Sequence, residues 1–161
     1  MTATADPPPA ARVFLVVVDE SEEMRNALRY ACRRAQRTNG HVALLHVIEP
    51  VEFQHWLGVG RVLEEDARAQ AELKLQKLAS DVFAQTGNMP VLHIREGKRA
   101  EQLVALLQED PSISLLVLAT ASGANPGPLV TFLLGHLGKR VKIPVTLVPG
   151  ELTLEEIDLL T

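Results

Sequence analysis

Short runs of valine, leucine and isoleucine alternate along the chain with longer stretches in which apolar residues recur every three or four positions. The first run, from Val13 to Val18, holds no polar residue and therefore predicts a strand that is buried on both faces. The helical stretches between the runs supply the crossovers that parallel strands require. The sequence therefore predicts an α/β fold, a five-stranded parallel sheet with helices on both faces.

The expected elements can be placed by residue number. Strands are expected at Arg12–Val18, His41–Ile48, Met89–Glu96, Ser112–Thr120 and Ile143–Pro149. Helical faces run from Met24 to Ala35, from Val62 to Val82, from Ala100 to Leu107 and from Leu129 to Val141. Ser21 is expected to cap the first helix, and the Thr153-x-x-Glu156 pattern predicts a short terminal helix.

Length and composition predict one domain with two short flanking segments. A chain of 161 residues fits a single domain, here residues 12–149. Residues 1–11 contain three consecutive prolines and are expected to form a flexible tail. Residues 150–161 form a C-terminal extension that carries the predicted short helix.

Several classes of protein are disfavoured by composition. A net charge of −4 and an aromatic content of 4% argue against nucleic-acid binding, which uses basic patches and stacking platforms. The single Cys32 excludes an internal disulfide framework. The apolar run Val13 to Val18 is far shorter than the ~20 residues that a membrane span needs, and the N-terminus lacks the pattern of a secretory signal. A cytoplasmic location is expected.

Parallel sheets bind ligands beyond the carboxyl ends of their strands, where the winding of the chain reverses. The informative loops are therefore the one after the first strand and the one from Ala119 to Pro128. Asp19 follows the first strand directly, and it either caps the next helix or accepts a hydrogen bond from a ligand. Gly135 and Gly138 fall inside a predicted helix, which suggests a close approach of the backbone to a neighbouring element or to a phosphate.

No enzyme signature is complete. The phosphate-binding GxxxxGK[ST] motif is absent, and Ser122 lacks the GxSxG context of a hydrolase nucleophile. The histidines show no metal-ligand spacing, so no metal site is expected; they are His41, His46, His55, His93 and His136.

Four segments in this order resemble the universal stress protein family: VVVDES, ALLHVIEP, LLVLAT and LLGHLGKRV-KIPVTLVP. The likeness covers about residues 12–149. It implies a Rossmann-like fold of the adenine nucleotide alpha hydrolase-like type and a role in the stress response. It also implies a homodimer that pairs its fifth strands, here Pro144 to Val148. The segment Leu152 to Leu160 either packs over that junction, packs on its own domain or frays.

The resemblance further implies ATP or AMP, with Mg²⁺, as a ligand, and it assigns residues at the ends of the first, second and fourth strands. By position these are Val18, Asp19, Val47, Ala119, Thr120, Gly123, Gly127, Gly135 and His136. The chain departs from the family motif G-x2-G-x9-G-[ST], because Ala119 stands at the first glycine and His136 at the final hydroxyl residue. Pro126 and Pro128 also lack backbone N–H groups that could bind phosphate.

Three functions are compatible with these observations. The first is a dimeric binding or regulatory protein of the stress response, with a degenerate nucleotide loop and an unidentified protein partner. The alternative is a sensor that binds ATP or AMP between Asp19, Val47 and residues 123–136. The third is an α/β enzyme of the nucleotidyl-transfer type, which the lack of an HxGH signature disfavours.

Overall fold

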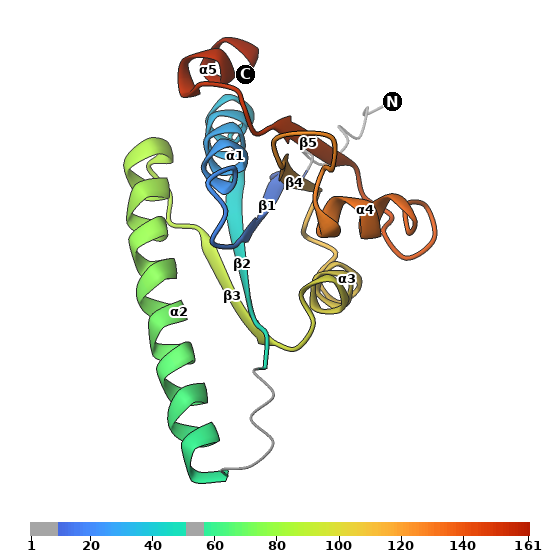
Figure 1. Cartoon of the computed structure of the whole chain (residues 1–161). Coiled ribbons are helices and arrows are strands. Elements are labelled where there is room, and N and C mark those ends of the chain that lie inside the picture. The colour runs from blue at the N-terminus through green and yellow to red at the C-terminus, as the bar shows by residue number, and fades with distance from the viewer. Residues whose placement is uncertain (1–9, 51–56) are drawn as a thin grey trace, which may run out of the picture.

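The computed structural model describes residues 10–50 and 57–161 and shows a parallel sheet of five strands (Figure 1). The strands are β1 (Val13–Val18), β2 (His41–Ile48), β3 (Val91–Glu96), β4 (Leu115–Thr120) and β5 (Val145–Pro149). Their order across the sheet is β3-β2-β1-β4-β5, and every neighbouring pair is parallel. The α/β prediction is confirmed.

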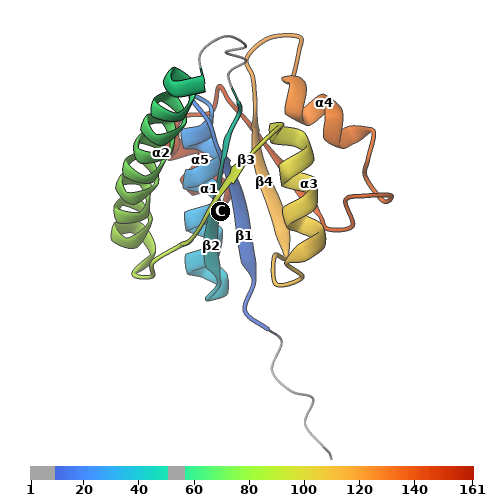
Figure 2. The same ribbon diagram turned by 90° about the horizontal axis from the view of Figure 1, so that it is seen from below.

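Helices cover both faces of the sheet (Figure 2). They are α1 (Met24–Thr38), α2 (Leu57–Thr86), α3 (Arg99–Glu109), α4 (Pro128–Leu134) and α5 (Leu154–Leu160). Helices α1, α2 and α5 lie on one face, and α3 and α4 lie on the other. None of the helices in the described part of the chain combines the length and the apolarity needed to cross a membrane.

Each face of the sheet has its own apolar core, because successive strand residues point to opposite faces. In β1, Val16 and Val18 pack towards α1 and α5, whereas Leu15 and Val17 pack towards α3 and α4. All four side chains are buried, as expected for the central strand of a parallel sheet.

Several element boundaries differ from the prediction. Four strands begin one to three residues later than expected: β1 at Val13, β3 at Val91, β4 at Leu115 and β5 at Val145. Helix α2 begins at Leu57, five residues before the predicted Val62. The N-cap of α1 is Glu23, which makes no side-chain capping hydrogen bond, so the prediction that Ser21 caps this helix was wrong. Ser21 instead donates its backbone N–H and its hydroxyl to Oδ1 of Asp19, at 2.8 and 2.5 Å. Both donor groups of Ser21 are therefore used within this local turn and not at the start of the helix.

The fourth helix is shorter than predicted. It ends at Leu134, and Gly135 follows as its C-cap. Gly138 has a φ of +79°, a left-handed conformation that favours glycine, and its N–H donates to the carbonyl of Val141 at 2.8 Å. The prediction that Gly135 and Gly138 lie inside a helix was therefore wrong, because these residues end the helix and turn the chain.

The C-terminal extension folds onto its own domain. Ile157 of α5 is fully buried against α1, and Thr153 caps α5 by accepting a hydrogen bond from the N–H of Glu156 at 3.2 Å. Arg29 of α1 donates from Nε and Nη2 to the two carboxylate oxygens of Asp158, both at 2.7 Å. Of the open alternatives for this segment, the structure shows packing on its own domain.

Candidate functional site

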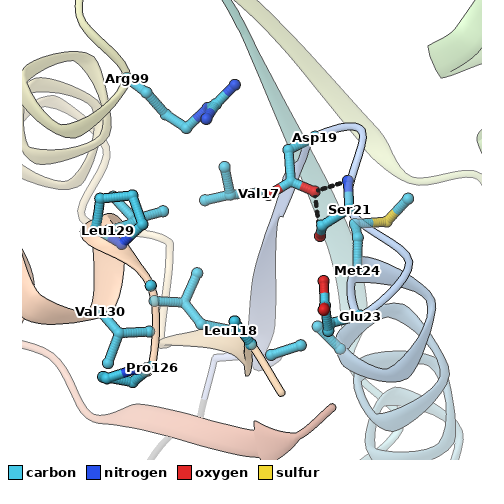
Figure 3. A pocket seen from close by; sticks show the side chains of 15 residues that line it. Val17, Asp19, Ser21, Glu23, Met24, Arg99, Leu118, Pro126, Leu129 and Val130 are labelled. Carbon is cyan, nitrogen blue, oxygen red and sulfur yellow. Dashed lines mark hydrogen bonds between the residues drawn. The ribbon is translucent and has the colours of Figure 1, made fainter. Parts of the chain in front are cut away.

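A cavity of about 170 Å³ opens at the carboxyl ends of β1 and β4 (Figure 3). This is where the winding of the chain reverses, because β1 leads through α1 to β2 on one side and pairs with β4 on the other. The walls come from the end of β1, the start of α1, the start of α3, the end of β4 and the loop into α4. A cavity therefore exists at the strand ends where the sequence predicts the site.

Asp19 lies on the α1 side of the cavity (Figure 3). Its Oδ1 accepts both hydrogen bonds from Ser21, which fixes the orientation of the carboxylate. No hydrogen bond from the described residues reaches its Oδ2. The backbone carbonyl of Asp19 accepts a hydrogen bond from Nζ of Lys74 at 2.9 Å, which fastens this turn to α2. A fixed carboxylate with a free oxygen can accept hydrogen bonds from a ligand.

Arg99 lies on the opposite wall, at the first residue of α3 (Figure 3). Its backbone N–H donates to Oε1 of Glu49 at 3.2 Å, which fixes the start of the helix. Its Nε is buried and has no hydrogen-bond partner among the described residues. The cavity therefore has carboxylates on one side, Asp19 and Glu23, and a guanidinium on the other.

The floor between these charged walls is apolar. It is formed by side chains from both central strands and from the first turn of α4, namely Val17, Leu118, Leu129 and Val130. Three of them are nearly fully buried, so the floor is continuous with the core beneath it. A flat apolar floor flanked by polar walls is typical of small-molecule sites.

The loop after β4 uses part of its hydrogen-bonding capacity internally. The N–H of Ala121 donates to the carbonyl of Pro126 at 3.2 Å, and the N–H of Gly127 donates to Oδ1 of Asn125 at 3.0 Å. Pro126 and Pro128 have no N–H to offer. Since phosphate-binding loops act through free backbone N–H groups, the two prolines and the two internal bonds reduce the number that this loop can offer to a phosphate.

The structure brings three of the nine predicted site residues to the cavity: Asp19, Ala119 and Gly127. Val18 points into the α1 core and is fully buried. The remaining five do not line this cavity; they are Val47, Thr120, Gly123, Gly135 and His136. The ring of His136 stacks on Phe132 and its Nδ1 lies 2.8 Å from the carbonyl of that residue, which ties it to α4.

Val47 lines a second hollow, of about 360 Å³, on the α2 side of the sheet edge. Its polar lining includes Glu20, His46 and Lys74. Lys74 donates to a carboxylate oxygen of Glu20 at 2.5 Å and lowers the pKa of that carboxyl. Burial, and then the nearby charge of Lys74, lower the pKa of His46, so its ring is neutral near pH 7. Among the residues that the structure describes, no cluster of three metal-ligating side chains occurs.

Sequence reasoning missed Arg99, Glu23 and Lys74 as parts of the two hollows. A signal for Arg99 existed, because it follows the third strand within three residues and so belongs to the same edge of the sheet. For Lys74 no such signal existed, since it reaches the site from the middle of α2.

Comparison with known proteins gives one family and a set of similar folds. The model of the universal stress protein family matches residues 11–149. Universal stress protein UspA from Lactobacillus plantarum is similar in structure, with 20% identity and a TM-score of 0.70 over 87% of this chain and 99% of that one. No curated protein sequence gives a significant match.

Several of the similar structures hold a nucleotide, among them one with cAMP. The universal stress protein from Archaeoglobus fulgidus in complex with dAMP shares 15% identity and a TM-score of 0.60, over 86% of this chain and 97% of that one. A universal stress protein family protein from Arabidopsis thaliana with AMP bound shares 15% identity and a TM-score of 0.57, over 86% and 91%.

At such identities the structural matches establish the shared fold. The family model, in contrast, spans the sequence from before β1 to the last residue of β5 and so includes every strand of the sheet. The chain belongs to the universal stress protein family.

Proposed function

We propose that this protein binds an adenine mononucleotide in the cavity between β1 and β4 and acts as a binding or regulatory protein in the stress response. The observation that carries the proposal is the hollow at the reversal point of the sheet, with the fixed carboxylate of Asp19 on its wall. The AMP and dAMP held by two proteins of the same fold supply the class of ligand.

The chemistry of the wall fits the nucleoside part of such a ligand. A carboxylate oxygen accepts hydrogen bonds from ribose hydroxyls, and the free Oδ2 of Asp19 is available for this. The apolar floor suits one face of a base or a sugar.

The loop after β4 favours a monophosphate over ATP. A triphosphate needs several backbone N–H donors, and here Ala121 and Gly127 use theirs within the loop. We therefore expect AMP to bind more tightly than ATP. Of the residues that the resemblance assigns to the phosphate end, this proposal keeps Gly127, which lines the cavity.

The proposal treats the protein as a binding module without rapid turnover. The Ser21 hydroxyl donates to Asp19 at the cavity wall, but no histidine or lysine of the described chain lines the cavity to serve as a stronger base, and the charged groups on its walls are Asp19, Glu23 and Arg99. ATP turnover above a buffer blank that is abolished in Asp19→Ala would contradict this part of the proposal.

The experiment is a thermal-shift titration with AMP, ADP and Mg-ATP at about 1 mM. A dissociation constant of ~10 μM would add ~2.7 kcal/mol to the folded state, which is roughly 5–10 °C for a chain of this size. Asp19→Asn should weaken AMP binding about tenfold, since it removes a charged acceptor. The matched control is Glu22→Gln, an exposed carboxylate that does not line the cavity. No shift with any nucleotide, in protein free of carried-over ligand, would contradict the proposal.

We further propose a homodimer that pairs the β5 strands of two copies. The support is the place of β5 at the edge of the sheet and the exposure of Leu147 on it, at 40%. An edge strand with an exposed apolar residue can accept a further strand.

A further inference from the structure

We propose that Arg99 binds the acidic group of the ligand, taking the part that the glycine loop plays in a phosphate cradle. The inference rests on the proposed nucleotide function for the identity of the ligand, but the anion site itself can be tested without a nucleotide. Arg99 is the first residue of α3 and lines the cavity from the wall opposite Asp19 (Figure 3).

The charge of Arg99 is not used by the fold. Five other arginines have a carboxylate within 4 Å: Arg29, Arg33, Arg68, Arg95 and Arg140. Arg99 has no such carboxylate among the described residues, and neither have Arg12, Arg25, Arg34 and Arg37; of these five, Arg99 alone has a guanidinium nitrogen that is shielded from solvent without a hydrogen-bond partner. A half-buried guanidinium without a carboxylate beside it is costly, and an anion bound in the cavity would reduce that cost.

The backbone holds Arg99 in this position. Gly97, directly before the helix, has a φ of +138°, a conformation that favours glycine, and its N–H donates to the carbonyl of Ile48 at 3.0 Å. The N–H of Arg99 donates to Glu49. These contacts join the start of α3 to the end of β2, so the backbone that carries the Arg99 side chain is held in place.

The two walls together define the kind of ligand. Asp19 and Glu23 attract hydrogen-bond donors, whereas Arg99 attracts an anion and can bind two phosphate oxygens at once. A nucleoside monophosphate carries hydroxyl donors at its sugar and an anion at its phosphate. Two N–H groups of the loop after β4 are engaged within the loop, and Arg99 is the one cationic side chain among the described residues that line this cavity.

The first test observes Arg99 directly. The Nε–H signals of arginines are recorded by ¹H–¹⁵N NMR, and the Arg99 signal is the one that Arg99→Lys removes. Inorganic phosphate and AMP should each shift this signal, and adenosine should leave it in place. An Arg99 signal that stays unchanged with phosphate and with AMP would overturn the inference, whatever the nucleotide does elsewhere.

The second test separates this inference from the proposed function. Arg99→Gln should weaken AMP binding at least about tenfold and leave adenosine binding unchanged, because a charge-assisted bidentate contact is lost. Lys98→Gln is the matched control, an exposed cation that does not line the cavity. Equal AMP affinity in Arg99→Gln and in the wild type would overturn the Arg99 assignment alone. If phosphate shifts the Arg99 signal while AMP and adenosine do not bind, the anion site stands and the nucleotide proposal fails.

Discussion

At the scale of single residues, Asn26 shows how a buried polar group can join distant parts of the chain. Its Nδ2 lies 3.1, 3.1 and 2.9 Å from the carbonyls of Pro149, Gly150 and Leu152. These carbonyls belong to the end of β5 and to the segment leading into α5. The two N–H bonds of one amide group therefore serve three backbone acceptors, and Pro149 accepts in addition from the N–H of Leu152 at 3.3 Å.

We expect Asn26→Ala to lower the free energy of unfolding by about 1–3 kcal/mol, since the carbonyls lose their donor. Asn26→Asp should cost more at pH 7, because it places a carboxylate against three carbonyl oxygens. Urea unfolding measures both, and the exposed Asn88→Ala serves as the control. An Asn26→Ala variant as stable as Asn88→Ala would contradict this account.

Cys32 gives a second residue-scale prediction. Burial in the α1 core raises the pKa of its thiol to about 12, so the thiol is neutral in the folded protein. Because the thiolate is the reactive form, we expect no reaction with a disulfide reagent at pH 8 in the folded state and one equivalent after denaturation. Rapid labelling of the native protein would show that α1 opens locally.

At the scale of elements, the end of α4 and the turn after it can be tested by comparing two glycine-to-alanine substitutions. Gly135 has helical dihedral angles, and an added Cβ would meet its nearest atom, the carbonyl oxygen of Phe132, at an ordinary 3.5 Å. We expect Gly135→Ala to be neutral or stabilising by up to ~1 kcal/mol. Gly138→Ala should be destabilising by roughly 1–2 kcal/mol because of its positive φ. Thermal unfolding of both variants checks this, and an equal effect would mean that the helix continues past Leu134.

The contact of α5 with α1 predicts a pH dependence. The Arg29 guanidinium beside Asp158 lowers the pKa of that carboxyl in the folded state. The resulting stabilisation is present above the unfolded pKa of about 3.9 and is lost as the pH falls through the lower folded value. Asp158→Asn should therefore unfold at lower urea than the wild type at pH 7, and the difference should shrink as the pH falls below the unfolded pKa. Glu151→Gln, an exposed neighbour, should show no such convergence.

The elements themselves could largely be predicted from the sequence. Strand β1 follows from an unbroken apolar run, and the buried face of α1 follows from apolar residues spaced by three and four positions. The end of α4 could not, because Leu137 and Val141 continue the helical spacing while Gly138 turns the chain. Here the backbone conformation of one glycine outweighs a favourable side-chain pattern.

At the scale of the whole molecule, the sheet topology allowed the position of the site to be predicted but not the roles of its residues. Asp19 could be placed because it follows a central strand directly. Arg99 could not be assigned a role, since its importance depends on the unpaired state of its charge within the fold. Val47 was assigned by resemblance, and it lines a different hollow from that of Asp19 although it shares a core with the floor of the first cavity.

The dimer proposal belongs at this scale as well. We expect sedimentation of the wild type to give twice the mass of one chain, and Leu147→Asp to shift it towards the monomer. The substitution places a charge on the exposed edge strand without disturbing the core. Leu159→Asp, exposed on α5, is the control. A wild type that sediments as a monomer at high concentration would contradict the proposal.

The central place of β1 has a consequence for how the chain is made. Its first partner, β2, leaves the ribosome soon afterwards, but its second partner is far away, since Phe14 pairs with Leu115, 101 residues later. At about 5–20 residues per second, synthesis needs roughly 5–20 s to deliver β4. During that time one side of an entirely apolar strand has no neighbour in the sheet. The first strand of this protein to be synthesised is thus among the last to be completed, and the nascent chain is most open to chaperones and to aggregation in that interval.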